Sequence, residues 1–134
     1  MMAVMSIRLK RVYDPPAKDD GFRVLVDRVW PRGISRQQLQ VEDWPKDVAP
    51  STELRRWFGH DPRRWDEFRK RYGEELAGQG EALERLVARA RQGRLTLVFA
   101  AKDARHNNAV VLKEHLERRL RDEAPGQGED GSRC

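Results

Sequence analysis

Cysteine is almost absent from this sequence. Its single cysteine, Cys134, is the last of 134 residues, so no disulfide can form within the chain and no thiolate cluster can bind a metal. Sulfur transfer or phosphatase chemistry through a cysteine nucleophile is excluded as well, because the loop after the apolar run ending at Phe99 contains no cysteine. The scarcity of cysteine predicts a protein of the reducing cytoplasm.

Long apolar runs and the common cofactor motifs are also missing. No stretch approaches the ~20 apolar residues of a membrane span, and the segment 1–6 is too short for the apolar region of a signal peptide. Neither the phosphate-binding loop G-x-x-x-x-G-K-S/T nor the dinucleotide turn G-x-G-x-x-G occurs. Three scattered histidines have no spacing for zinc, and no G-x-S-x-G pattern is present. We therefore expect no membrane insertion, no secretion, no metal and no cofactor.

Charged residues are abundant, at 37% of the chain, and the mean hydropathy is -0.87. The apolar residues nevertheless fall in periodic blocks that include four Trp and four Phe, as in a globular protein. The net charge of +5 and the pI near 9.8 favour anionic partners. Many basic residues lie beside acidic ones on predicted helices, so any binding to nucleic acid is expected to be weak. The length predicts one α/β domain over 7–123, between a flexible segment 1–6 and a disordered tail 124–134.

The apolar pattern predicts an α/β sheet with parallel strands and helices on both faces, flavodoxin-like or Rossmann-like in class. The expected strands are Ile7–Val12, half-buried, Val24–Val29, central, and Leu95–Phe99, buried. Capping and glycine signals predict helices that begin near Ser35, Ser51, Pro62, Gly80 and Asn107 or Asn108. The second helix ends at Gly59 and the fourth before Gly93. In the third helix, apolar residues recur at spacings of three and four and are expected to line one buried face: Trp65, Phe68, Tyr72 and Leu76.

Two polar clusters follow the predicted strands, at the end of a parallel sheet where ligands usually bind. The first contains Asp27, Arg28, Trp30 and Arg32. Arginine forks suit phosphate or carboxylate, and an indole face can stack on a base or a cation. The alternative is structural, with Trp30 covering the edge of the core and Asp27 paired with Arg28.

The second cluster contains Lys102, Asp103 and Asn108 and leads into the amino terminus of a helix, which favours anions. Lys102 and Asp103 act either as an acid and a base or as a pair that holds the loop. Asn108 is either a ligand contact or, like Asn107, a helix cap.

A third group of candidate contacts lies on or next to the predicted helix near Ser51. It consists of Ser51, Arg55 and His60. The segment His60-Asp61-Pro62 is typical of a helix start, where His60 either makes a structural hydrogen bond or serves as a proton carrier or anion contact.

Several blocks in order resemble the YeaO-like family, domain of unknown function 488. They are the segments 24–33, 44–55, 60–62, 96–103 and 107–109, and the resemblance extends from about Ile7 to Glu117. It implies a small cytoplasmic bacterial α/β protein with a flavodoxin-like or Rossmann-like sheet, and it implies no established activity. The residues that carry the family's motifs are Asp27, Arg28, Trp30, Pro31, Arg32, Gly33, Ala49, Pro50, Ser51, Arg55, His60, Lys102, Asp103 and Asn108.

These observations leave more than one function open. The first hypothesis is an enzyme for a phosphorylated or nucleotide-like anion, with Arg28, Arg32 and Arg55 as anion contacts and Asp27 or Asp103 as general base. The alternative is a non-catalytic module that binds nucleic acid or a small anion. A third is an interaction protein whose polar blocks only brace the fold. The sequence does not indicate the oligomeric state.

Overall fold

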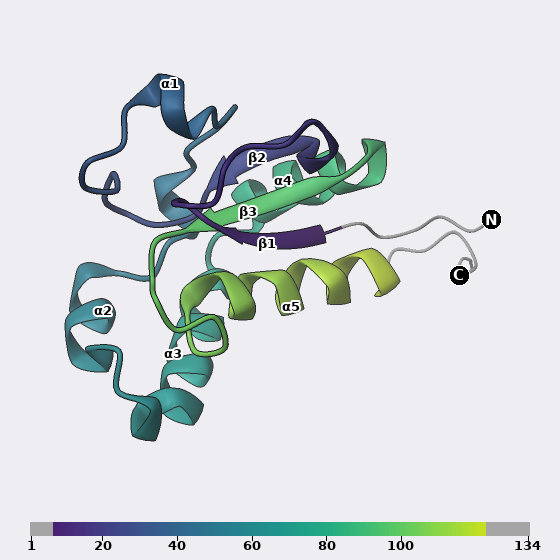
Figure 1. Cartoon of the computed structure of the whole chain (residues 1–134). Coiled ribbons are helices and arrows are strands. Elements are labelled where there is room, and N and C mark those ends of the chain that lie inside the picture. Colours follow the sequence, from purple (N-terminus) through teal and green to yellow (C-terminus); the bar gives the residue numbers. More distant parts are fainter. Residues whose placement is uncertain (1–6, 123–134) are drawn as a thin grey trace, which may run out of the picture.

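Three parallel strands form the centre of the computed structural model, which describes residues 7–122 (Figure 1). β1 (Ile7–Arg11) and β2 (Phe22–Leu25) both pair with β3 (Leu95–Phe99), so the strand order is β1-β3-β2. The predicted α/β class with a parallel sheet and flanking helices is confirmed, and it is consistent with a flavodoxin-like or Rossmann-like arrangement. The segments expected to be flexible or disordered, 1–6 and 124–134, lie outside the described residues.

The helices begin and end at the residues that the local signals indicate. Ser35 caps α1 in a capping box with Gln38, Ser51 caps α2, and Gly59 ends α2 in a left-handed conformation. The helices are α1 (Arg36–Leu39), α2 (Thr52–Phe58), α3 (Trp65–Ala77), α4 (Gly80–Gln92) and α5 (Asn108–Asp122), with 3-10 turns η1 (Lys18–Asp20), η2 (Lys46–Val48) and η3 (Pro62–Arg64). Among residues 7–122, no helix has the length and apolarity needed to cross a membrane.

One strand prediction was wrong in extent and position. The segment Val24–Val29 was expected to be a central strand, but β2 is shorter and lies at an edge, while β3 lies in the centre. Within residues 7–122, the outer side of β2 forms β-pairing only through an isolated bridge between Val24 and Asp43. Val24 and Leu25 are fully buried because layers cover both faces of the sheet, which explains why an edge strand is as apolar as a central one.

The main core lies between the sheet and the three long helices, α3, α4 and α5 (Figure 1). Alternate strand residues such as Val24 and Leu97 face this layer, because successive side chains of a strand point to opposite faces. On α3, Phe68, Tyr72 and Leu76 form the buried face that the sequence spacing predicts.

Helices were expected on both faces, and among residues 7–122 the other face of the sheet carries a helix only in the form of the short α1. The connection from β1 to β2 is only ten residues long, 12–21, and contains a single 3-10 turn. A small apolar cluster covers the carboxyl half of this face, with α1 and the partly buried Trp30 and Trp44 packed against it. On this face, the chain between β2 and α2, which includes the short α1, takes the place of a layer of long helices.

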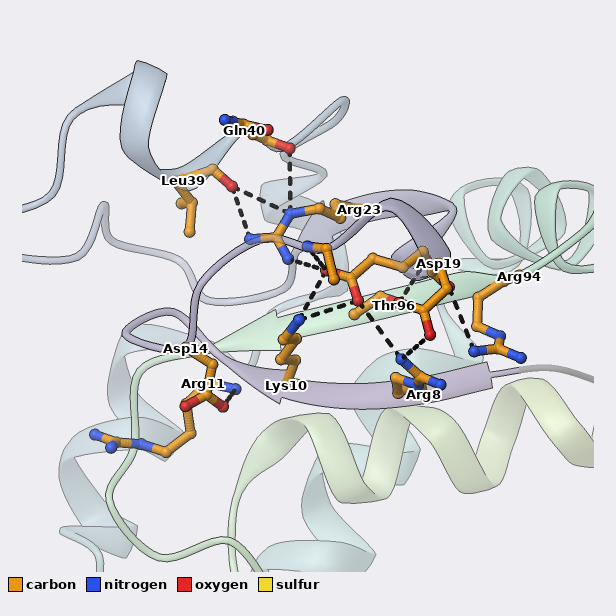
Figure 2. A network of polar contacts seen from close by, with 12 residues as sticks. Arg8, Lys10, Arg11, Asp14, Asp19, Arg23, Leu39, Gln40, Arg94 and Thr96 are labelled. Atoms are coloured by element: carbon orange, nitrogen blue, oxygen red, sulfur yellow. Dashed lines mark hydrogen bonds and ion pairs between the residues drawn. The ribbon is translucent and has the colours of Figure 1, made fainter.

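An ionic cluster covers the amino half of the same face (Figure 2). Asp20 is fully buried and binds Arg23 at 2.7 Å and Lys10 at 3.0 Å. The buried guanidinium of Arg23 also donates to the main-chain oxygens of Leu39 and Gln40, at the carboxyl end of α1. The cluster thus joins the 12–21 connection, the sheet and α1. Sequence reasoning missed it, because Asp20 lies in the turn-like segment 18–21 and Arg23 at the start of an apolar run, where neither residue is expected to be buried.

Candidate functional site

A pocket of about 860 Å³ lies beyond the carboxyl ends of β2 and β3, bordered by α2 and the amino end of α5. Figure 1 shows α2 and the β3–α5 loop at this end of the sheet. The pocket brings together nine of the ten sequence-predicted site residues: Asp27, Arg28, Trp30, Arg32, Arg55, His60, Lys102, Asp103 and Asn108. The two polar clusters therefore meet, as parallel strands require. The roles of these residues in binding or catalysis stay predictions.

Asp27 is held in the wall of the pocket by two donors. Its Oδ2 accepts from the amide of Ala100 at 2.9 Å, and its Oδ1 accepts from Asn108 Nδ2 at 3.0 Å. The same Asn108 nitrogen donates to the carbonyl of Val26, so Asn108 ties α5 to the end of β2. Burial raises the pKa of Asp27, and the hydrogen bonds from Asn108 and Ala100 oppose this rise, followed by the charges of Arg55 and His60.

Arg28 and Trp30 both line the pocket and both brace the loop that follows β2. Arg28 does not pair with Asp27; its guanidinium donates to the carbonyls of Pro50 and Ala49, just before α2. The indole of Trp30 donates to Ile34 O at 2.6 Å and packs edge-on against Trp44. Each side chain thus has a structural contact and also faces the pocket.

Ser51 is the predicted site residue that does not line the pocket. Its hydroxyl accepts from the amide of Leu54, as a helix cap does, and donates to Glu75 Oε2 at 2.6 Å. The amide of Ser51 donates to the other oxygen of Glu75. These contacts anchor α2 to α3, so the geometry gives Ser51 a capping role rather than a ligand contact.

Replacing Ser51 by Ala is expected to lower the free energy of unfolding by about 1–2 kcal/mol, because the cap of α2 and the hydroxyl's hydrogen bond to Glu75 are lost, while the main-chain amide still donates to Glu75. Urea denaturation measures this loss. Thr52→Ala, at an exposed neighbouring position with no side-chain hydrogen bond in the described part of the chain, is the matched control and should change the value by less than about 0.5 kcal/mol. Equal stabilities for the two variants would contradict the capping role.

His60 projects from a strained turn at the end of α2. Gly59 and His60 both have positive φ values, 54° and 58°, and a residue with a side chain adopts this conformation at a cost of about 1 kcal/mol or more. His60 is exposed, and its ring lies 6.3 Å from that of Phe58. Within residues 7–122 no hydrogen bond involves its ring, so the hydrogen-bonded His60 considered from the sequence is not observed.

The loop between β3 and α5 is organised by Asp103. One carboxylate oxygen accepts from the amides of Arg105 and His106, and the other lies 2.8 Å from His106 Nδ1. The amide of Arg105 and then the His106 side chain hold the pKa of Asp103 below its usual range. Asn107 caps α5 by accepting from Val110 N. Asp103 therefore holds the loop through Arg105 and His106; within residues 7–122 it does not form the pair with Lys102 considered from the sequence, and its lowered pKa leaves it a weak base.

The pocket has an excess of positive charge. Its wall carries five cations, Arg28, Arg32, Arg55, Arg56 and Lys102, against the two carboxylates of Asp27 and Asp103. In the described range, the side chains of four of these cations make no hydrogen bond or ion pair with the protein: Arg32, Arg55, Arg56 and Lys102. All four are exposed. No group of three or more metal-ligating side chains occurs among residues 7–122.

Sequence reasoning missed part of the pocket wall. Arg56 lies beside the predicted Arg55, and the floor includes Phe58 and Phe68. The sequence could have indicated Arg56, because it directly follows Arg55 in a short predicted helix. The spacing of Phe68 indicated only a position in the core. His106, which binds Asp103 and packs edge-on against Trp65, gave no signal of its own.

The amino-acid sequence matches one family model over residues 6–134, a range that includes all the residues lining the pocket. That model is DUF488-N3i, described as the inactive DUF488-N3 subclade. The chain belongs to the DUF488 family. The predicted resemblance to the YeaO-like family, domain of unknown function 488, is confirmed by this model together with the relatives that follow.

Three relatives cover most of the chain. The uncharacterised protein YeaO of Escherichia coli K12 is 44% identical over 112 residues, which are 84% of this chain and 97% of that protein. The uncharacterised proteins Mb3100c of Mycobacterium bovis and Rv3073c of Mycobacterium tuberculosis H37Rv are each 44% identical over 116 residues, 87% of this chain and 98% of theirs. No solved structure matches the chain.

Proposed function

We propose that this DUF488 protein binds a small phosphorylated or nucleotide-like anion in the pocket beyond β2 and β3. The observation that carries the proposal is the set of free cations in one concave site: Arg32, Arg55, Arg56 and Lys102. Guanidinium forks bind phosphate or carboxylate in a bidentate manner, and a lysine adds a point charge. The pocket volume, about 860 Å³, is within the usual range for a small-molecule site.

Binding without turnover is the form of this proposal that we favour. The matching family model describes an inactive subclade. Both carboxylates of the pocket already accept hydrogen bonds, and those of Asp103 favour its charged, weakly basic form. A general base needs a proton acceptor whose pKa is near the working pH, and Asp103 does not meet this requirement.

Catalysis on a phosphorylated substrate is the second candidate, and Asp27 is the residue that supports it. Burial raises the pKa of Asp27 in the pocket wall, as in many general bases. If the wild type releases phosphate or a leaving group from phosphate esters and Asp27→Asn does not, the result would favour an enzyme. Stabilisation by the same esters without any turnover would favour the binding module.

Nucleic acid is the weaker partner in this proposal. Many helical cations are paired with acids, among them Arg69 with Glu114 and Arg119 with Glu84. Paired cations release few counterions on a phosphate backbone, so binding is expected to be weak and to depend little on salt.

We also propose a cytoplasmic location, because the single cysteine Cys134 leaves no disulfide to form within the chain.

Millimolar phosphate esters are expected to raise the melting temperature of the wild type by several degrees. A ligand at a hundred times its Kd adds about 2.7 kcal/mol to the free energy of unfolding. The probes are inorganic phosphate, ribose 5-phosphate and adenosine monophosphate, measured by thermal shift and confirmed by calorimetry. Arg55→Ala should remove most of the gain.

The control is Arg85→Ala, an exposed arginine of α4 that lies outside the pocket and should retain the full gain. Absence of stabilisation by all three probes would contradict the anion site. An equal loss of the gain in the two variants would instead show nonspecific attraction to a basic protein.

A further inference from the structure

Asp27 is an unusual group in a cationic pocket, and its contacts define what it can still bind. Its two oxygens accept from Ala100 N and Asn108 Nδ2, which fix the orientation of the carboxylate. A carboxylate has about four acceptor sites. In the described part of the chain, no cation donates to it; Arg55 and His60 act on it only through their charges. It therefore keeps acceptor capacity within the pocket wall.

The surroundings of Asp27 make its remaining capacity to accept hydrogen bonds important for ligand binding. Burial removes water from Asp27 and raises its pKa, so its charged form is incompletely solvated. A hydrogen-bond donor brought by a ligand would replace the lost water, whereas a second anionic group at the same place would be repelled. Most of the free cations that attract an anion lie on other segments than Asp27, with Arg55 and Arg56 on α2 and Lys102 on the loop after β3, whereas Arg32 lies on the same loop after β2 as Asp27.

We propose that Asp27 is a specificity-determining residue that selects anions carrying a hydroxyl or amino donor, of which a sugar phosphate is the simplest class. The inference rests on the proposed anion site. The phosphate contacts the arginines and Lys102, and a hydroxyl donates to the carboxylate of Asp27. A site that binds a hydroxyl discriminates against an analogue without one; here the analogue would displace water from the partly buried Asp27 and return no hydrogen bond to its remaining acceptor sites.

The test compares ribose 5-phosphate with n-pentyl phosphate, which has the same number of carbons and the same phosphate but no hydroxyl. Isothermal titration calorimetry at pH 7.5 gives the ratio of the two affinities in the wild type and in Asp27→Asn. We expect the ratio to fall about tenfold in the variant, mainly through weaker binding of ribose 5-phosphate. Pentyl phosphate should bind as well or better, because a negative charge has been removed.

Any preference of the pocket for the apolar pentyl chain is the same in the wild type and the variant, so it cancels when their two affinity ratios are compared. Asp66→Asn, an exposed acid of α3 outside the pocket, is the control and should keep the wild-type ratio. The same ratio in Asp27→Asn as in the wild type would overturn the specificity role while leaving the anion site intact. Failure of both compounds to bind the wild type would overturn the anion site itself and this inference with it.

Asn108→Ala provides a second measurement if Asp27→Asn does not fold. It keeps the charge of Asp27 but removes the side chain that orients Oδ1. The affinity ratio should then fall several-fold, with pentyl phosphate binding little changed. An unchanged ratio in this folded variant would also overturn the role given to Asp27.

Discussion

Replacing Asp20 by Asn is expected to lower the free energy of unfolding by about 3–5 kcal/mol at pH 7, because it leaves the buried guanidinium of Arg23 and the partly buried ammonium of Lys10 without their counterion. Asp20 is fully buried, and its carboxylate binds Lys10 and the almost fully buried Arg23. Asn has the same shape but no charge, so the loss measures the ionic contact rather than a cavity. Urea denaturation at 25 °C gives the value.

Asp19→Asn is the matched control one residue away. Its carboxylate is largely exposed and lies 3.5 Å from Arg8, so its removal should cost less than about 1 kcal/mol. A similar cost for the two variants would show that the ionic cluster does not hold the second face of the sheet.

The effect of Asp20→Asn is expected to shrink in acid. Burial opposes the charged form of Asp20, but the amide of Ala17 and the side chains of Lys10 and Arg23 outweigh it, so its pKa lies below the ordinary value. A lowered folded pKa stabilises the protein above the unfolded pKa of about 3.9, and this contribution is lost as the pH falls through the folded pKa. The difference between wild type and variant should therefore be constant near neutrality and narrow below about pH 4. A difference that widens in acid would contradict this sign.

Replacing Phe68 by Ala is expected to lower the free energy of unfolding by about 3–5 kcal/mol, through lost apolar contact and the cavity left behind. Phe68 is 2% exposed and stacks on Phe58 with ring centroids 4.3 Å apart. Its ring also contacts those of Trp65 and Tyr72. Because Phe58 and Phe68 form part of the pocket floor, the stabilisation by phosphate esters should fall as well.

Phe68→Leu is the conservative control, since it keeps most of the volume and should cost less than half as much. Urea denaturation measures both variants, and the thermal shift with ribose 5-phosphate measures the pocket. A stability within about 1 kcal/mol of the wild type for Phe68→Ala would show that the aromatic stack contributes little. If Phe68→Ala loses stability but ribose 5-phosphate still raises its melting temperature as in the wild type, Phe68 stabilises the core and is not needed for binding in the pocket.

The sequence alone was sufficient for features set by neighbouring residues. The caps at Ser35 and Ser51, the stop at Gly59 and the apolar face of α3 were all predicted and confirmed. Capping and helical spacing depend on residues a few positions apart, so the local sequence is sufficient to predict them. The meeting of the two polar clusters followed from one further rule, that parallel strands place their carboxyl ends at the same edge of a sheet.

Only the tertiary structure decided which polar residues are buried and what they bind. Nothing in the local sequence indicates that Asp20, in a turn-like segment, or Arg23, at the start of an apolar run, is buried, yet packing of the 12–21 connection over the sheet removes both from water. Ser51 lies among the motif residues, but its position against Glu75 on α3 directs it away from the pocket. Burial and ion pairing depend on segments far apart in the chain, whose contacts form only when the layers pack.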